Sequence, residues 1–151
     1  MMRSIGIRVE PKSVTFAVYD FDSAEIVNIE KLNVPKALDI PERLKFIRSN
    51  MLDIFREFDI TRAGIRITES NSQHLNIARL QIEGVIQEAI ASSCVESYYT
   101  GQISNISAKL GFNRSDFKKY LEGEMDYEIE NWGNLTKPEK EAVFAAIGAA
   151  A

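Results

Sequence analysis

Residues 5–20 read IGIRVEPKSVTFAVYD, and their pattern is the strongest indication of the fold. From Ile5 to Val9, apolar residues alternate with less apolar ones, and this period of two predicts a β-strand. The Pro-Lys-Ser segment that follows is typical of a turn. Residues 14–19 are rich in β-branched and aromatic side chains, which favour a second strand. The chain is therefore predicted to begin with an antiparallel hairpin.

The sequence after this hairpin changes from strand to helical periodicity. Residues 25–32 alternate once more and predict a third strand, which completes an antiparallel meander. Two further short strands are expected at 63–68 and 95–99. Helical spacing of apolar residues, with cap residues at several ends, predicts helices over 39–58, 78–90, 103–110, 115–121 and 136–151. Residues 123–135 lack a regular pattern.

This order of elements predicts an α/β protein. A meander followed by alternating helices and strands fits a mixed five-stranded sheet in the order 3-2-1-4-5, with the second strand antiparallel to the first and helices on its faces. No internal repeat, low-complexity tract or linker divides the sequence. We therefore expect one domain over residues 1–151.

Composition restricts the classes of function. The net charge is −4 over 151 residues, so a wide phosphate-binding face is not favoured. One cysteine and one histidine exclude thiolate clusters and histidine-rich zinc sites. No apolar run approaches the roughly 20 residues needed to span a bilayer, so we expect no membrane association and a cytoplasmic location.

Taken in order, six segments resemble the RuvC-type resolvases of the ribonuclease-H-like superfamily, and small bacterial families of the same build. The first hairpin is similar to the one that opens with Gly-Ile-Asp-Pro-Gly in that family. The other similar segments are PERLKFIRSNMLDIFREF (41–58), AGIRITES (63–70), LQIEGVIQEAI (80–90), VESYYTGQISNISAKLG (95–111) and EKEAVFAAIGAA (139–150). The resemblance implies a ribonuclease-H-like fold over nearly the whole chain.

The resemblance also implies a metal site. In the family, carboxylates at the ends of the first and fourth strands and at the start of the last helix hold two magnesium or manganese ions about 4 Å apart for phosphodiester cleavage. The matching positions here are Arg8, Glu69 and Glu141, and the partner of Glu141 falls on Pro138. Arginine does not ligate metals. We therefore predict a degenerate, Arg8-occluded site without a cofactor, in which Arg8 pairs with Glu69 or, second, with Glu141.

A shifted site is the alternative. Glu10 shares a strand face with Arg8, and Glu10-Pro11 resembles the Asp-Pro pair of the family. Glu10 and Glu69, with Glu141 or alternatively Glu139 completing the set, would then hold magnesium or manganese. Glu139 stands three residues after Thr136, which is the spacing of a capping box, and it is interpreted as a helix cap.

Other residues have weaker functional interpretations. Four cations form a candidate nucleic-acid edge, or simply the solvated side of a helix: Lys109, Arg114, Lys118 and Lys119. His74 is interpreted as a polar residue near a helix start, Cys94 as a buried filler and Trp132 as a loop anchor.

Three functions remain open from the sequence. The first is a non-catalytic module that contacts protein or nucleic acid. The second is an active metal-dependent endonuclease acting on structured DNA or RNA. The third is a homodimeric structural or regulatory protein with no nucleic-acid role.

Overall fold

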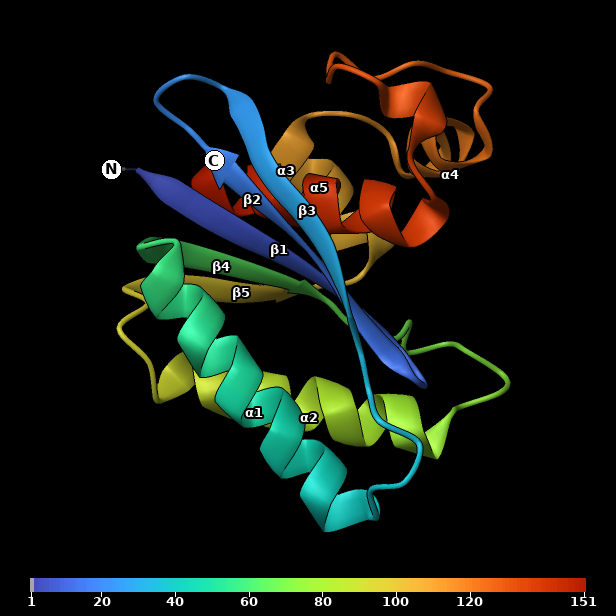
Figure 1. Ribbon diagram of the computed structural model, residues 1–151. Coiled ribbons are helices and arrows are strands. Elements are labelled where there is room, and N and C mark those ends of the chain that lie inside the picture. Colours follow the sequence, from blue (N-terminus) through green and yellow to red (C-terminus); the bar gives the residue numbers. More distant parts are fainter. Residues whose placement is uncertain (1) are drawn as a thin grey trace.

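The computed structural model describes residues 2–151 and contains one five-stranded sheet (Figure 1). The sheet order is β3-β2-β1-β4-β5; β2 runs antiparallel to β1 and β3, while β4 and β5 run parallel to β1. This confirms the predicted topology. The strands are β1 (Arg3–Glu10), β2 (Ser13–Asp20), β3 (Glu25–Asn33), β4 (Ile60–Arg66) and β5 (Ser97–Gly101).

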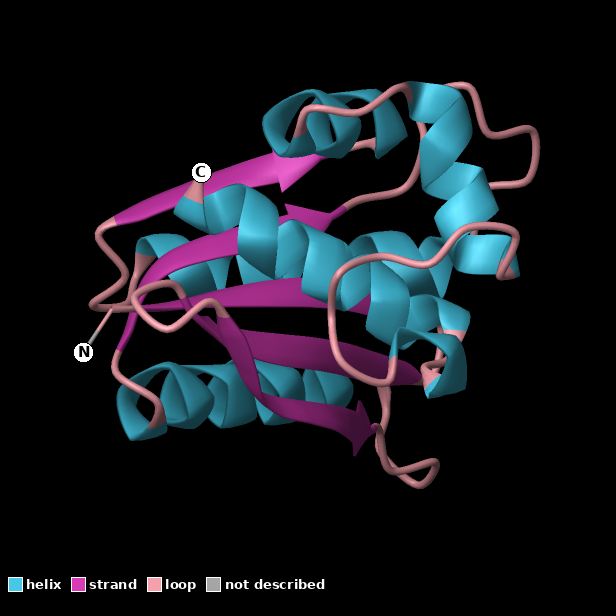
Figure 2. Cartoon of the chain, turned by 90° about the horizontal axis from the view of Figure 1, so that it is seen from above, coloured by secondary structure: helices cyan, strands magenta, loops and turns pink. Residues whose placement is uncertain are grey.

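Helices cover both faces of this sheet. They are α1 (Ile40–Glu57), α2 (Ile77–Ala91), α3 (Ile103–Leu110), α4 (Arg114–Glu122) and α5 (Lys137–Ala150), with a short 3-10 turn, η1 (Trp132–Asn134). Helices α1 and α2 lie on one face, and α5, joined by α3 and α4, lies on the other; Figure 2 shows α5 over the strands. Thr136 and Glu139 exchange capping hydrogen bonds at the start of α5, which confirms the capping interpretation of Glu139.

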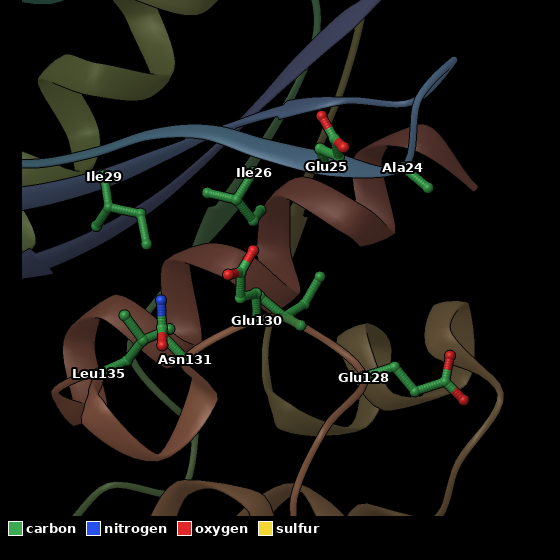
Figure 3. A pocket seen from close by; sticks show the side chains of 9 residues that line it. Ala24, Glu25, Ile26, Ile29, Glu128, Glu130, Asn131 and Leu135 are labelled. Carbon is green, nitrogen blue, oxygen red and sulfur yellow. The ribbon is translucent and has the colours of Figure 1, made fainter.

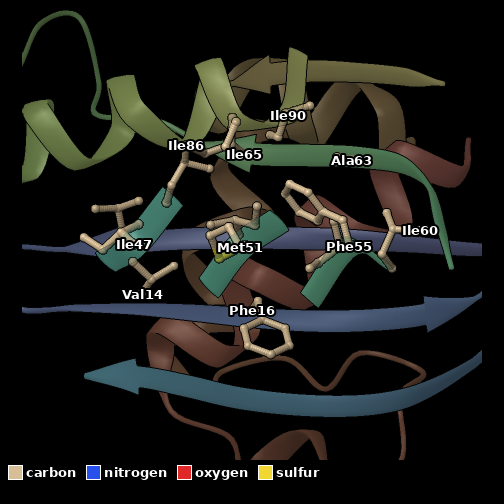
Figure 4. Close-up of a cluster of buried hydrophobic side chains, with 14 of the residues drawn as sticks. Val14, Phe16, Ile47, Met51, Phe55, Ile60, Ala63, Ile65, Ile86 and Ile90 are labelled. Atoms are coloured by element: carbon tan, nitrogen blue, oxygen red, sulfur yellow. The ribbon is translucent and has the colours of Figure 1, made fainter. Parts of the chain in front are cut away.

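The face under α1 and α2 is an aliphatic core (Figure 4). Odd-numbered residues of β1 point into it because successive side chains of a strand alternate between the two faces. Its buried members include Ile5, Ile7, Val9, Val14, Phe16, Ile47, Met51, Phe55, Ile65, Ile86 and Ile90. Large branched side chains therefore fill the space between these helices and the sheet and set the distance between them.

The opposite face brings backbone against backbone. A Cβ atom on Gly6 would lie 1.9 Å from the carbonyl oxygen of Ala142, and one on Gly64 would lie 2.6 Å from that of Ala145. The hydroxyl of Ser4 donates to the Ala146 carbonyl at 2.7 Å. The run of small residues at the end of the sequence therefore lets α5 approach β1 and β4 closely.

Several local predictions differ from the structure. Strand β4 begins three residues earlier than expected, because a left-handed residue, Asp59, ends α1 abruptly and starts the strand at Ile60. The buried position proposed for Cys94 is wrong: its thiol is exposed in the turn between α2 and β5, since the apolar stripe of α2 ends at Ile90. Trp132 is buried and its indole N–H donates to the Tyr120 carbonyl at 3.2 Å, which confirms its anchoring role.

Among residues 2–151, no helix is long and apolar enough to cross a bilayer.

Candidate functional site

Three elements converge where β1 and β4 end and α5 begins. Arg8 and Arg66 are direct partners in the parallel pairing of β1 with β4. Gly6 and Gly64 face α5, and because side chains alternate along a strand, Arg8 and Arg66 face it too. Glu141 lies one turn into α5. The site is thus at the carboxyl ends of parallel strands, where functional groups collect in α/β sheets.

One carboxylate oxygen lies between two guanidinium groups. Oε2 of Glu141 is 3.0 Å from Nε of Arg8 and 2.9 Å from Nε of Arg66. The three side chains are 11 %, 10 % and 5 % exposed, respectively. Neither Oε2 of Glu141 nor Nε of Arg66 has a hydrogen bond of good angle in the part of the chain that is described. The contacts among these groups are therefore mainly Coulombic, in a setting where water screens little.

Glu69 is engaged through both of its oxygens. Its Oε2 lies 3.1 Å from Nη1 of Arg66 and accepts a hydrogen bond from the N–H of Ile103 at 2.9 Å. Its Oε1 lies 3.4 Å from Nη2 of Arg114. Ile103 is the first residue of α3, so the helix dipole adds to the stabilisation of this carboxylate. Arg66 links Glu69 to Glu141.

Burial lowers the pKa of Arg8 to about 10, from its ordinary value near 12.5. The neighbouring Glu141 carboxylate opposes this shift, and the Arg66 cation adds to it. Arg8 remains a cation at neutral pH. A cation this buried requires a partner, because an unpaired guanidinium in this position costs several kcal/mol.

A second ionic pair supports the site from the opposite face of the sheet. Glu83 of α2 is 3 % exposed and accepts hydrogen bonds from the backbone N–H and hydroxyl of Thr68, at 3.1 and 2.8 Å. Arg79 lies 3.8 Å from Glu83 and donates to the Val9 carbonyl at 2.9 Å. These contacts fix the end of β1, at Val9, and the segment just after β4, at Thr68.

The sequence predicts Glu69 as the first choice of partner for Arg8 and Glu141 as the second, and this order is wrong. Arg8 pairs with Glu141, because Arg66 lies between Arg8 and Glu69 and takes Glu69 as its own partner. Sequence reasoning missed Arg66. The sequence did carry a signal for it. Alternation along AGIRITES puts Arg66 on the face away from Ile65, and pairing of the first strand with the fourth then puts Arg66 beside Arg8.

Glu10, the shifted candidate, is the last residue of β1 and accepts a hydrogen bond from the hydroxyl of Ser13 at 3.4 Å. Over residues 2–151, no group of three or more acidic, histidine or cysteine side chains could hold a metal ion. Glu10, Glu69 and Glu141 are thus not brought together as a ligand set.

The candidate basic residues are exposed on α3 and α4. Three of them have neighbours: Arg114 contacts Glu69, Lys119 lies 3.9 Å from Asp116, and the ammonium of Lys109 lies 4.6 Å from the ring centroid of Tyr99. Lys118 makes no ion pair within the described residues. Two of these four positive charges, those of Arg114 and Lys119, therefore have a carboxylate neighbour.

No protein-family model and no curated protein sequence matches the chain. Solved structures do match. RuvC of Thermus thermophilus in complex with a Holliday junction substrate is similar with a TM-score of 0.71 and 14 % identity, over 99 % of this chain and 93 % of RuvC. Another structure of that RuvC is similar with a TM-score of 0.72 and 13 % identity, again over 99 % of this chain and 93 % of RuvC. The protein has the fold of the RuvC resolvases.

The yeast mitochondrial Holliday junction resolvase Ydc2 is similar as well, with a TM-score of 0.61 and 12 % identity over 97 % of this chain and 77 % of Ydc2. Identities this low establish the fold alone, and function has to be argued from the residues of the site.

The residues present do not fit the metal ions that the family resemblance implies. The first-strand position carries Arg8, which offers no lone pair to a metal. The two carboxylates left, Glu69 and Glu141, are each in contact with guanidinium groups at 3.4 Å or less. A divalent ion at this position would meet two buried positive charges.

Proposed function

We propose that this RuvC-fold protein is a non-catalytic interaction module, in which an ionic cluster replaces the metal ions of a nuclease. The observation that supports this most directly is the contact of Glu141 with both Arg8 and Arg66 within 3.0 Å. A buried carboxylate needs compensating charge, and here the chain supplies it from its own strands. An active metal-dependent endonuclease is the alternative that the following experiment separates.

The experiment removes both buried cations. In the double variant Arg8→Asp/Arg66→Ala, three carboxylates repel one another, so its melting temperature in chelator should fall well below that of wild type. Magnesium or manganese should raise the melting temperature of this variant and leave that of wild type unchanged. The charge-matched control is Arg48→Asp/Arg56→Ala, because both of these arginines are exposed on α1.

Two results would contradict the non-catalytic proposal. Metal-dependent stabilisation of wild type, or cleavage of a branched DNA by wild type with manganese, would overturn the non-catalytic proposal in favour of the nuclease.

We further propose that any contact with nucleic acid is weak and strongly salt-dependent. The net charge is −4, and two of the four candidate cations, Arg114 and Lys119, already have a carboxylate neighbour. Fluorescence anisotropy with duplex DNA, branched DNA and RNA at low and moderate salt measures this. Tight binding that persists at moderate salt would contradict it.

We also propose a homodimer, because one apolar patch is exposed near the starts of α1 and α2. Ile77 is 73 % exposed, Leu75 58 %, Ile40 50 % and Leu80 38 %. Ile40 and Ile77 line the same shallow groove of about 120 Å³. Patches of this kind on soluble proteins mark interaction surfaces, and a two-fold dimer would cover it with its own copy.

Sedimentation of wild type and of Ile77→Lys/Leu80→Lys tests the dimer. Wild type should sediment as a dimer at micromolar concentration and the variant as a monomer. A wild type that stays monomeric at all concentrations would contradict the proposal.

A further inference from the structure

A second surface, which shares no residue with the ionic cluster, lies between β3 and the segment that precedes α5. It is a groove of about 540 Å³, within the range of roughly 300 to 1,000 Å³ that is usual for binding sites (Figure 3). We call it the β3 groove, and its lining residues are Ala24, Glu25, Ile26, Ile29, Glu128, Ile129, Glu130, Asn131 and Leu135.

The floor of the β3 groove is apolar. In Figure 3, Ile26 and Ile29 point from β3 toward the segment that carries Leu135. These two isoleucines share a face although they are three residues apart, because the pairing of β2 with β3 shifts at Tyr19, so that Ile26 opposes Tyr19 and Ile29 opposes Ala17. A bulge of this kind re-aims side chains. Half-buried aliphatic side chains are thus left open to a ligand.

The rim of the β3 groove is acidic and uncompensated. Glu25, Glu128 and Glu130 are exposed, and in the part of the chain that the structure describes none of them forms an ion pair. No cation is among the lining residues. In Figure 3, the carboxylate of Glu130 points toward β3, whereas the side chain of Glu25 lies on the other face of β3 from Ile26, as expected for neighbouring residues of a strand.

The strand that forms one wall is also an edge of the sheet. β3 pairs with β2 alone, so its other side offers backbone N–H and C=O groups to a further strand. Addition of an extended peptide to such an edge takes its affinity from main-chain hydrogen bonds and its specificity from alternate side chains.

The opposite wall is held rigidly by aromatic packing. The ring of Trp132 lies 4.8 Å from that of Phe144 and 5.5 Å from that of Tyr127, centroid to centroid. The hydrogen bond from the indole N–H of Trp132 to the Tyr120 carbonyl fixes this ring further. A wall that is ordered before binding loses little conformational entropy when a ligand arrives.

We infer that the β3 groove binds an extended segment of a partner protein, in which lysine or arginine alternates with aliphatic residues, as an added strand along β3. This inference rests on the proposed function as an interaction module. Because alternate side chains of a strand point to opposite faces, the aliphatic residues would cover Ile26 and Ile29, and the cations on the other face would meet Glu25, with Glu130 adding negative charge at the groove. Nucleic acid is disfavoured here because its phosphates would lie near exposed carboxylates that have no ion-pair partner among the described residues.

The test is an unbiased selection of phage-displayed random peptides on the full chain. Peptides with alternating basic and aliphatic residues should be enriched on wild type, and a synthetic copy of the most enriched one serves as the probe. Its affinity, by fluorescence anisotropy, should fall at least about tenfold with Glu25→Lys/Glu130→Lys. The matched control is Glu57→Lys/Glu96→Lys, which makes the same charge change at exposed positions outside the groove and should bind as wild type does.

Hydrogen exchange provides the second readout. The probe peptide should slow exchange of backbone amides in β3, since an added strand protects them. Loss of binding in the control variant, enrichment of acidic peptides, or unchanged exchange in β3 would overturn the inference. Nuclease activity of wild type would remove the proposed function and leave peptide binding measurable, so the two failures can be told apart.

Discussion

The two faces of the sheet are built on different principles. Under α1 and α2, interlocking aliphatic side chains such as Ile47 and Met51 keep the helices away from the strands. Under α5, glycines bring the backbones of β1 and β4 against the backbone of the helix. The first face can adapt by side-chain repacking, while the second has only backbone atoms at its contact with Gly6. The ionic cluster lies on the second face, where the rigid contact of α5 with the strands fixes Glu141 against Arg8 and Arg66.

The largest effect should come from filling the backbone contact. Gly6→Val would place side-chain atoms on the Ala142 carbonyl and the Ala146 N–H, which lie 1.9 and 2.2 Å from the Cβ position. We expect a loss of more than about 5 kcal/mol, enough to leave the chain unfolded by circular dichroism. The control is Gly84→Ala on α2, where a Cβ meets nothing within 4 Å. It should gain up to about 1 kcal/mol in urea unfolding, and a folded Gly6→Val protein would show that α5 can move away.

A large but smaller effect is expected on the aliphatic face. Phe55 of α1 is fully buried, so Phe55→Ala should lower the free energy of unfolding by about 4 kcal/mol through lost burial and a cavity. Phe55→Leu keeps most of the volume and should lose about 1 kcal/mol, measured by urea unfolding. An equal loss in the free energy of unfolding of both variants would show that side chains on this face do not repack.

The ionic cluster should rank third. Glu141→Ala leaves Arg8 and Arg66 facing each other without their shared carboxylate, and we expect a loss of about 3 kcal/mol in urea unfolding. The double variant Arg8→Met/Glu141→Met replaces one charge of each sign by apolar volume and should stay within about 1 kcal/mol of wild type. If the double variant is the less stable of the two, the cluster stabilises the fold by more than charge compensation.

The smallest effect is expected for an ion pair on the other face. Arg48 of α1 and Glu88 of α2 lie 2.6 Å apart with side chains 40 % and 54 % exposed. Water screens this pair, so Arg48→Ala should leave the urea midpoint unchanged within error. If Arg48→Ala lost as much stability as Glu141→Ala, exposed and buried charges would contribute equally to the stability of this fold.

Local patterns were sufficient for most of the fold. Alternation from Ile5 to Val9, helical spacing from Leu44 to Phe58 and the capping box at Thr136 are properties of short segments, and each formed the expected element. Exposure was harder to predict. The sequence predicts that Cys94 is buried, but its thiol is exposed, because the end of an apolar helix stripe depends on which neighbours cover it.

For the site, the amino-acid sequence is enough to place an arginine on the first strand and glutamates after the fourth strand and at the start of the last helix. How these charges pair depends on tertiary structure. The parallel register of β1 with β4 brought Arg66 beside Arg8, and the close approach of α5 brought Glu141 to both. Ion pairing depends on distances of a few ångströms between segments far apart in the chain, and no periodicity along the sequence encodes those distances.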